Sequence, residues 1–234
     1  MSGELDDRAD ELPWPEPIGP SRGVSEAIRA ECTKDLKCSR GSSAGKRLLL
    51  SMLISGLALG LLTYLAFSHT RTDGAVRAAL FGAIGWGVVQ AAVLFVGLAR
   101  PPGRRISRAW RLVIAGGVPV AFLAWLAWSG AGRLPFATFL HPDHVHRALD
   151  CGVHAILIGA VASVGMLLVW RGTDPLSPGL SGALAGLVGG LAGAAAVGVA
   201  CPTVEVWHLW LAHGLVVISM AVLGFFVGRR WLAP

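Results

Sequence analysis

Apolar residues in this chain gather in six long runs that are separated by shorter polar segments. The runs cover residues 48–67, 78–99, 112–130, 151–170, 180–200 and 208–228. Each has about 20 residues, the length that an α-helix needs to cross a bilayer core of about 30 Å. Within lipid, only helices and closed barrels satisfy every backbone N–H and C=O group. The pattern therefore predicts an all-α fold, a polytopic bundle of six transmembrane helices over residues 48–228.

The 47 residues before the first run differ in character. They are polar and have four prolines between positions 13 and 20. A segment of this composition buries too little apolar surface to form a core, so we expect a largely disordered tail. Within it, Val24, Ile28 and Leu36 share one face of a short amphipathic helix predicted for about 21–37. That helix either rests on the membrane surface or binds a partner protein.

Composition and charge support a membrane protein and indicate its orientation. The chain is 54% hydrophobic and 15% charged, whereas soluble domains have about 25% charged residues. Lys and Arg next to membrane helices favour the cytoplasmic side. With the N-terminus inside, thirteen basic residues flank the inner ends of the runs and four flank the outer ends. The inner set comprises Lys34, Lys37, Arg40, Lys46, Arg47, Arg100, Arg104, Arg105, Arg108, Arg111, Arg171, Arg229 and Arg230. The outer set comprises Arg71, Arg77, Arg133 and Arg147. Both termini, the second being residues 229–234, are thus expected to be cytoplasmic.

This topology places two cysteines at the outer ends of helices. Cys151 opens the fourth run and Cys201 follows the fifth. Two such thiols form a disulfide if their Cα atoms approach to about 4.4–6.8 Å. They are also suited to bind soft metal ions or to react with modifying reagents. Alternatively, they are unrelated buried residues that act as small apolar side chains. The spacing alone leaves these possibilities open.

Histidines fall on the same predicted outer side as these cysteines. Imidazole and thiolate donors suit zinc or copper, so the histidines near the cysteines are candidate ligands of a transient metal ion. These candidates are His141, His144, His146, His154, His208 and His213. Their spacing matches no specific metal motif, and a solvated loop with incidental histidines is the simpler interpretation. His208 and His213 are five residues apart, which in a regular helix places them on different faces.

The helix interiors contain few groups for transport or catalysis. Gln90 is the only amide well inside a run, whereas transporters usually place ionisable groups at mid-membrane. No phosphate-binding loop or catalytic set is recognisable, so we predict that the chain is not an enzyme and needs no cofactor. Gly182, Gly186 and Gly190 instead repeat every four residues. This spacing predicts close packing of the fifth helix against its neighbours.

The C-terminal third resembles a known family. The segments that carry the resemblance are CGVHAILIGA from Cys151, RGTDPLSPGLSGALAGLVGG from Arg171, ACPTVEVWHLWLAHG from Ala200, and the closing GRRWL. Their order and spacing are similar to those of the NrsF-like family of bacterial anti-sigma factors, which are six-helix inner-membrane proteins. The resemblance extends to the first three helices by topology.

The resemblance implies a protein that holds an extracytoplasmic-function sigma factor at the inner membrane face. The contact would come from the tail, to which we assign Val24, Ile28 and Leu36. Cys151 and Cys201 would correspond to the cysteines that sense oxidants or heavy metals from the outer side. The expected partners are then a sigma factor and the lipid bilayer, with no direct contact to nucleic acid and no small-molecule substrate. The alternative functions are a small metal-handling transporter that uses the outer histidines and a structural membrane subunit.

Overall fold

The computed structural model describes residues 21, 23–27, 43–67, 73–99, 106–130, 142–171, 173–174, 176–201, 203 and 205–232. The chain divides into two units, Met1–Gly41 and Ser42–Pro234. In the first unit, residues 23–27 form a short helical segment in which Val24 is half exposed. Ile28, Leu36, Cys32, Cys38 and most of the predicted amphipathic helix lie outside the described residues.

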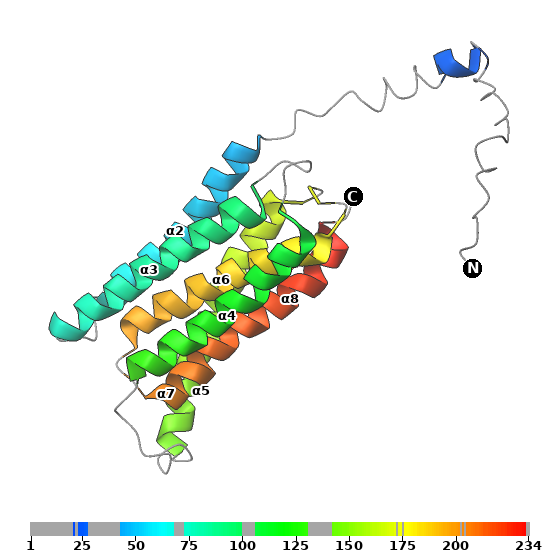
Figure 1. The fold of residues 1–234 in the computed structure, drawn as a ribbon. Coiled ribbons are helices and arrows are strands. Elements are labelled where there is room, and N and C mark those ends of the chain that lie inside the picture. The colour runs from blue at the N-terminus through cyan, green and yellow to red at the C-terminus, as the bar shows by residue number, and fades with distance from the viewer. Residues whose placement is uncertain are drawn as a thin grey trace, which may run out of the picture. The chain divides into compact units, whose positions relative to one another are not determined.

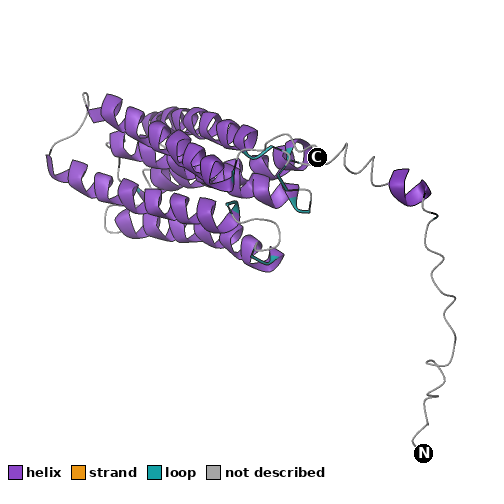
Figure 2. Ribbon diagram, turned by 90° about the horizontal axis from the view of Figure 1, so that it is seen from above, coloured by secondary structure: helices purple, strands orange, loops and turns teal. Residues whose placement is uncertain are grey.

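The second unit is all-helical over its described residues. Its helices are α2 (Ala44–Phe67), α3 (Asp73–Gly97), α4 (Arg108–Gly130), α5 (Pro142–Val169) and α6 (Pro178–Ala200). The last segment consists of a short α7 (Val206–His208), a π-helix η4 (Leu209–Gly214) and α8 (Leu215–Trp231). These long helices lie side by side along a common direction (Figure 2). Each corresponds to one of the six hydrophobic runs.

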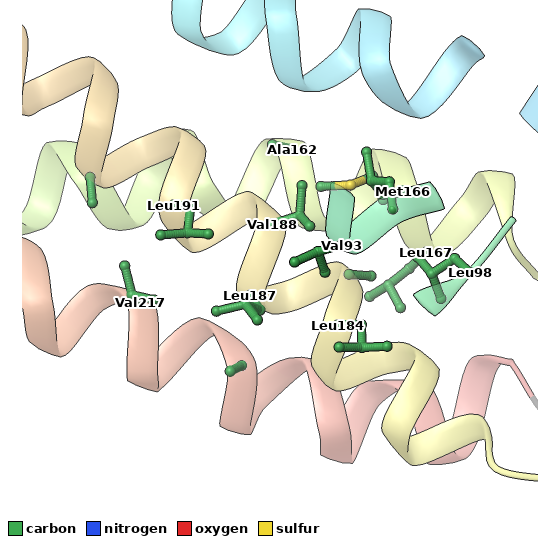
Figure 3. Packing of buried hydrophobic residues seen from close by; sticks show 14 of the residues in the cluster. Val93, Leu98, Ala162, Met166, Leu167, Leu184, Leu187, Val188, Leu191 and Val217 are labelled. Carbon is green, nitrogen blue, oxygen red and sulfur yellow. The ribbon is translucent and has the colours of Figure 1, made fainter. Parts of the chain in front are cut away.

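Helix α6 is the centre of the bundle. It contacts α2, α3, α4, α5 and α8, and it runs between α3 on one side and α4 and α8 on the other (Figure 1). Its side chains Leu184, Leu187, Val188 and Leu191 are fully buried. They meet side chains of α3, α5 and α8 in one continuous core (Figure 3). A helix that is apolar all round and buried on every side is typical of the middle of a membrane bundle.

Glycines allow α6 to lie so close to its neighbours. A Cβ atom at Gly182 would collide with the Gly224 backbone of α8, and one at Gly186 would collide with the Met220 carbonyl group. On another side of α6, a Cβ at Gly193 would collide with the Ala155 carbonyl group of α5. Gly190 also faces α8, next to Met220. Without Cβ atoms, backbones approach to direct contact, which increases van der Waals attraction between helices in lipid.

The outer surface of the bundle is apolar. Phe81, Trp128 and Val161 are each at least 73% exposed, and further large apolar side chains cover the other helices. Within the part of the chain that the structure describes, four helical segments are long and apolar enough to cross a membrane: Arg108–Ser129, Val145–Val169, Pro178–Ala200 and Val206–Trp231. In α3 the apolar stretch found among the described residues is Phe81–Gly97. So large an exposed apolar surface requires lipid around it, and the chain is a membrane protein.

Polar side chains are placed inside the bundle. Gln90 of α3 is 2% exposed and accepts a hydrogen bond from Ser55 of α2. The indole Nε1 of Trp170 donates to Ser51 Oγ over 2.8 Å. Such bonds join helices in lipid, where an unpaired polar group has no water to replace its partner. Gln90 therefore has a packing role in this structure.

Candidate functional site

The structure brings Cys151 and Cys201 together at one end of the bundle. Cys151 lies in α5, and Cys201 directly follows α6. The Cys151 thiol donates a hydrogen bond to Cys201 Sγ over 3.8 Å. Cys201 has an extended backbone (φ −70°, ψ 119°), which is the conformation expected of the residue before a proline, here Pro202. The proline thus ends α6 where the thiol faces α5.

His208 joins these two thiols from the next helical segment. Its Nε2 atom lies 3.1 Å from Cys201 Sγ, and the residue is 4% exposed. Among the described residues, one group has donor atoms close enough to hold a metal ion: Cys151, Cys201 and His208, within 4.8 Å of one another. The three residues lie in α5, directly after α6 and in α7, so no short sequence motif predicts the group.

A π-helix brings His213 to the same side as His208. Their ring centroids are 5.8 Å apart, which corrects the expectation that residues five apart lie on different faces. In a regular α-helix, two residues five apart point about 140° away from each other. Segment η4 is wound more widely, with i→i+5 hydrogen bonds, so the angle between His208 and His213 is much smaller than in an α-helix. The sequence has no pattern that predicts this local winding.

The imidazole of His213 is buried with one nitrogen unpaired. The residue is 1% exposed, and its Nδ1 atom donates to the Ala194 carbonyl oxygen of α6 over 3.1 Å. This bond assigns the proton to Nδ1 and leaves the lone pair on Nε2. Nε2 is buried and has no hydrogen-bond partner.

Neighbouring groups favour the ionised form of Cys201. The hydrogen bond from the Cys151 thiol lowers the pKa of the Cys201 thiol, and contacts with His208 and His213 act in the same direction. Desolvation by burial opposes them. A thiolate is the reactive and metal-binding form of cysteine, so Cys201 is the thiol that is better prepared for either chemistry.

The site borders a largely apolar cavity of about 300 Å³ between α5 and the last helical segment. Val145, Leu149 and Val153 line it from α5. Glu205 and His208 line it from the other side. His208 therefore lies between the cavity, which it lines, and Cys201, which it contacts.

The other predicted histidines are placed differently. His146 is exposed and pairs with Asp150 one helical turn away, with 2.9 Å between His146 Nδ1 and Asp150 Oδ2. His154 is exposed, and its Nδ1 atom donates to the Asp150 carbonyl oxygen over 2.7 Å. Neither belongs to the group of three donors. His141 lies outside the described residues, and the side chain of His144 is not described.

A second polar cluster, which the sequence did not predict, lies at the opposite end of α6. Arg111 of α4 forms an ion pair with Asp174, which precedes α6, with 3.1 Å between Arg111 Nη1 and Asp174 Oδ2. Ser177 and Ser181 accept hydrogen bonds from the same guanidinium over 2.5 Å each. Both charged residues are almost completely buried. The sequence feature that could have indicated this cluster is Asp174, an acidic residue close to Arg171 in the segment between the fourth and fifth hydrophobic runs.

These features define a helical membrane protein with a thiol–imidazole cluster at one end of its central helix. Residues 33–233 match the model of a family described as NrsF, negative regulator of sigma F. The match covers most of the chain, and the chain belongs to this family of sigma-factor regulators, which is not an enzyme family. The family name implies a sigma factor as partner. No curated protein matches the chain. No solved structure matches it either.

Proposed function

We propose that this protein is an anti-sigma factor of the bacterial inner membrane that holds an extracytoplasmic-function sigma factor through its N-terminal tail. The observation that carries the proposal is the family match, because residues 33–233 include part of the tail together with the whole bundle. Sigma factors work in the cytoplasm, so the binding segment has to lie there. The excess of basic residues at that end of the helices favours the same orientation.

The proposed contact is the apolar face of the tail, formed by Val24, Ile28 and Leu36. An amphipathic helix binds a partner by laying such a face into an apolar groove. Val24 is half exposed in its helical turn. The family match begins at residue 33 and therefore includes Leu36 but neither Val24 nor Ile28. This boundary makes Leu36 the first of the three residues to test.

The proposed signal acts on Cys151 and Cys201 at the outer face. The two sulfur atoms are 3.8 Å apart, whereas a disulfide needs about 2.05 Å. Disulfide formation by an external oxidant, which takes up the two electrons and two protons of the thiols, would therefore draw the ends of α5 and α6 together. The thiol cluster and the Arg111–Asp174 ion pair lie at the two ends of α6, which has 23 residues and is about 34 Å long.

Close packing supports transmission along α6. Gly182 and Gly186 are in backbone contact with α8, so a shift of α6 is not absorbed by flexible side chains between them. Packed elements of this kind move between discrete arrangements. In this mechanism the shift reaches the inner end of the bundle, next to the start of α2, and the tail releases the sigma factor.

Co-purification tests the proposal. The full chain is purified in detergent together with each extracytoplasmic-function sigma factor of the same organism in turn, and compared with a chain that begins at Ser42 and with L36D. We expect the full chain to retain the sigma factor, and both altered chains to lose it. The double variant E26Q/R29Q changes polar positions of the same predicted helix and should bind normally. Undiminished binding by the chain that begins at Ser42 would contradict the proposal, because the contact with the sigma factor would then lie outside the tail.

A further inference from the structure

The geometry at the outer end of α6 points to a site for a zinc ion. We propose that Cys151, Cys201 and His208 bind Zn²⁺ and that His213, whose ring centroid lies 5.8 Å from that of His208, supplies the fourth ligand. The inference deepens the proposed function, on which it rests for its biological meaning, because it names the chemical class of ligand at the thiol pair. The binding itself is measured independently of any sigma factor.

The spacing of the sulfur atoms matches a shared metal ion. In a tetrahedral site, two thiolates at the usual Zn–S distance of about 2.3 Å have sulfur atoms about 3.8 Å apart. The observed separation of Cys151 Sγ and Cys201 Sγ is 3.8 Å. The same geometry gives about 3.6 Å between a thiolate sulfur and an imidazole nitrogen. The structure has 3.1 Å between Cys201 Sγ and His208 Nε2. These two separations are within about half an ångström of those in a zinc site, and the donor atoms of Cys151, Cys201 and His208 all lie within 4.8 Å of one another.

His213 has the hydrogen bonding of a metal ligand. A histidine that binds zinc typically donates its second ring N–H to a carbonyl or carboxylate oxygen, which orients the ring. His213 does this through Nδ1 to the Ala194 carbonyl oxygen. Its Nε2 atom, which carries the lone pair, is buried without a partner beside His208. An unpaired polar atom in this setting requires a reason, and a bound cation provides one.

The π-helix η4 brings His213 close to His208, and so allows four residues rather than three to contribute ligands. With α-helical winding, His213 would point away from His208, toward a different neighbour. Single π-turns within longer helices occur frequently at functional sites. Here η4 lies within the last apolar segment and carries His213 as its fifth residue. The donor set of two thiolates and two imidazoles favours zinc or copper over magnesium and calcium, which prefer oxygen ligands.

Metal titration tests the site. The full chain carrying C32S and C38S, which removes the tail thiols, is purified in detergent under reducing conditions and titrated with Co²⁺, then with Zn²⁺. We expect one Co²⁺ per chain with the visible absorption of a tetrahedral thiolate site, and its displacement by Zn²⁺. The variants C151S, C201S and H208A should each weaken Zn²⁺ binding by about 100-fold or more, and H213A by about 10- to 100-fold. H154A, which alters an exposed histidine one turn from Cys151, should bind as the parent chain does.

X-ray absorption of the zinc-loaded parent chain keeps the test independent of whether the variants fold. Two sulfur and two nitrogen neighbours are expected. A zinc ion surrounded by oxygen and nitrogen alone, or Zn²⁺ binding that survives C151S and C201S, would overturn the inference.

The two proposals fail in different ways. A reduced chain that binds no zinc, but whose C151S variant no longer responds in cells, would remove the metal site and leave the sensing function standing. A chain that binds zinc through these four residues but never retains the sigma factor would leave the site and remove the function.

Discussion

Arg111 and Asp174 form an ion pair over 3.1 Å although 63 residues separate them, and they are 3% and 1% exposed. The pair joins the first turn of α4 to the turn between α5 and α6. Ser181 of α6 completes the connection by donating to the Asp174 carboxylate. Helix α4, the turn between α5 and α6, and α6 itself are thus tied together at the end of α6 that lies away from the cysteines.

Breaking this ion pair should destabilise the bundle strongly. In R111M the Asp174 carboxylate loses its cation while it stays buried, a change that costs about 3–5 kcal/mol in other proteins. The loss is measured by equilibrium unfolding in detergent. R108M removes an exposed arginine one turn earlier and should cost less than about 0.5 kcal/mol. The double variant R111M/D174L should regain much of the loss, because no unpaired charge remains. Equal stabilities of R111M and R108M would contradict this account.

A methyl group at the α6–α8 contact should be harder to accommodate than one on the lipid-facing surface. The Cβ atom of G186A would collide with the Met220 carbonyl group, whereas a Cβ at Gly116 of α4 has no atom within 4 Å. We expect G186A to lower the free energy of unfolding by about 1–3 kcal/mol through overpacking. G116A introduces the same atom and should not destabilise the protein. If both variants unfold alike, α6 and α8 are not in backbone contact.

Loss of either the Cys151 or the Cys201 thiol should uncouple the response from its inducer. In cells that carry a reporter for the sigma factor, C151S and C201S should each hold expression at the uninduced level when the inducer is added, because a lone thiol can neither form the disulfide nor complete the metal site. The tail double variant C32S/C38S should respond as the parent does. Normal induction in both C151S and C201S would show that the signal enters elsewhere.

The proposed orientation predicts which end of the bundle reagents reach from outside. Ser107 precedes α4, Ser129 lies near its other end, and both are exposed. In a chain without its own cysteines, a membrane-impermeant maleimide should label S129C in intact cells, and S107C only after the cells are opened. Trp210 Nε1 donates to the Leu123 carbonyl oxygen of α4, which places Ser129 at the end of the cysteine–histidine cluster. The reverse labelling pattern would place the tail outside and exclude its contact with a sigma factor.

The hydrophobic runs alone were enough to predict the helical class and the approximate position of each helix. Helix α6, Pro178–Ala200, matches the predicted run 180–200 closely, because an uninterrupted apolar segment in lipid has few alternatives to a helix. Helix α5 begins at Pro142, nine residues before its run. This extension is mostly polar and contains the His146–Asp150 pair, whose i,i+4 spacing supports a helix. Its apolar residues Val145 and Leu149 line the cavity. The resemblance of the C-terminal third to a family of sigma-factor regulators is confirmed by the family match.

Only the tertiary structure decided which residues meet. Sequence spacing placed Cys151 and Cys201 on one side of the membrane, but their 3.8 Å separation depends on how α5 packs against the end of α6. It also gave no sign that η4 would turn His213 toward His208, because no residue pattern in this stretch marks a π-helix. The Arg111–Asp174 pair was hidden for the same reason: each residue is unremarkable in its own flank, and the ion pair exists because three helices converge there. The pattern of apolar residues along the sequence predicts where a single helix lies in the membrane. A site made by several helices depends on how those helices pack against one another.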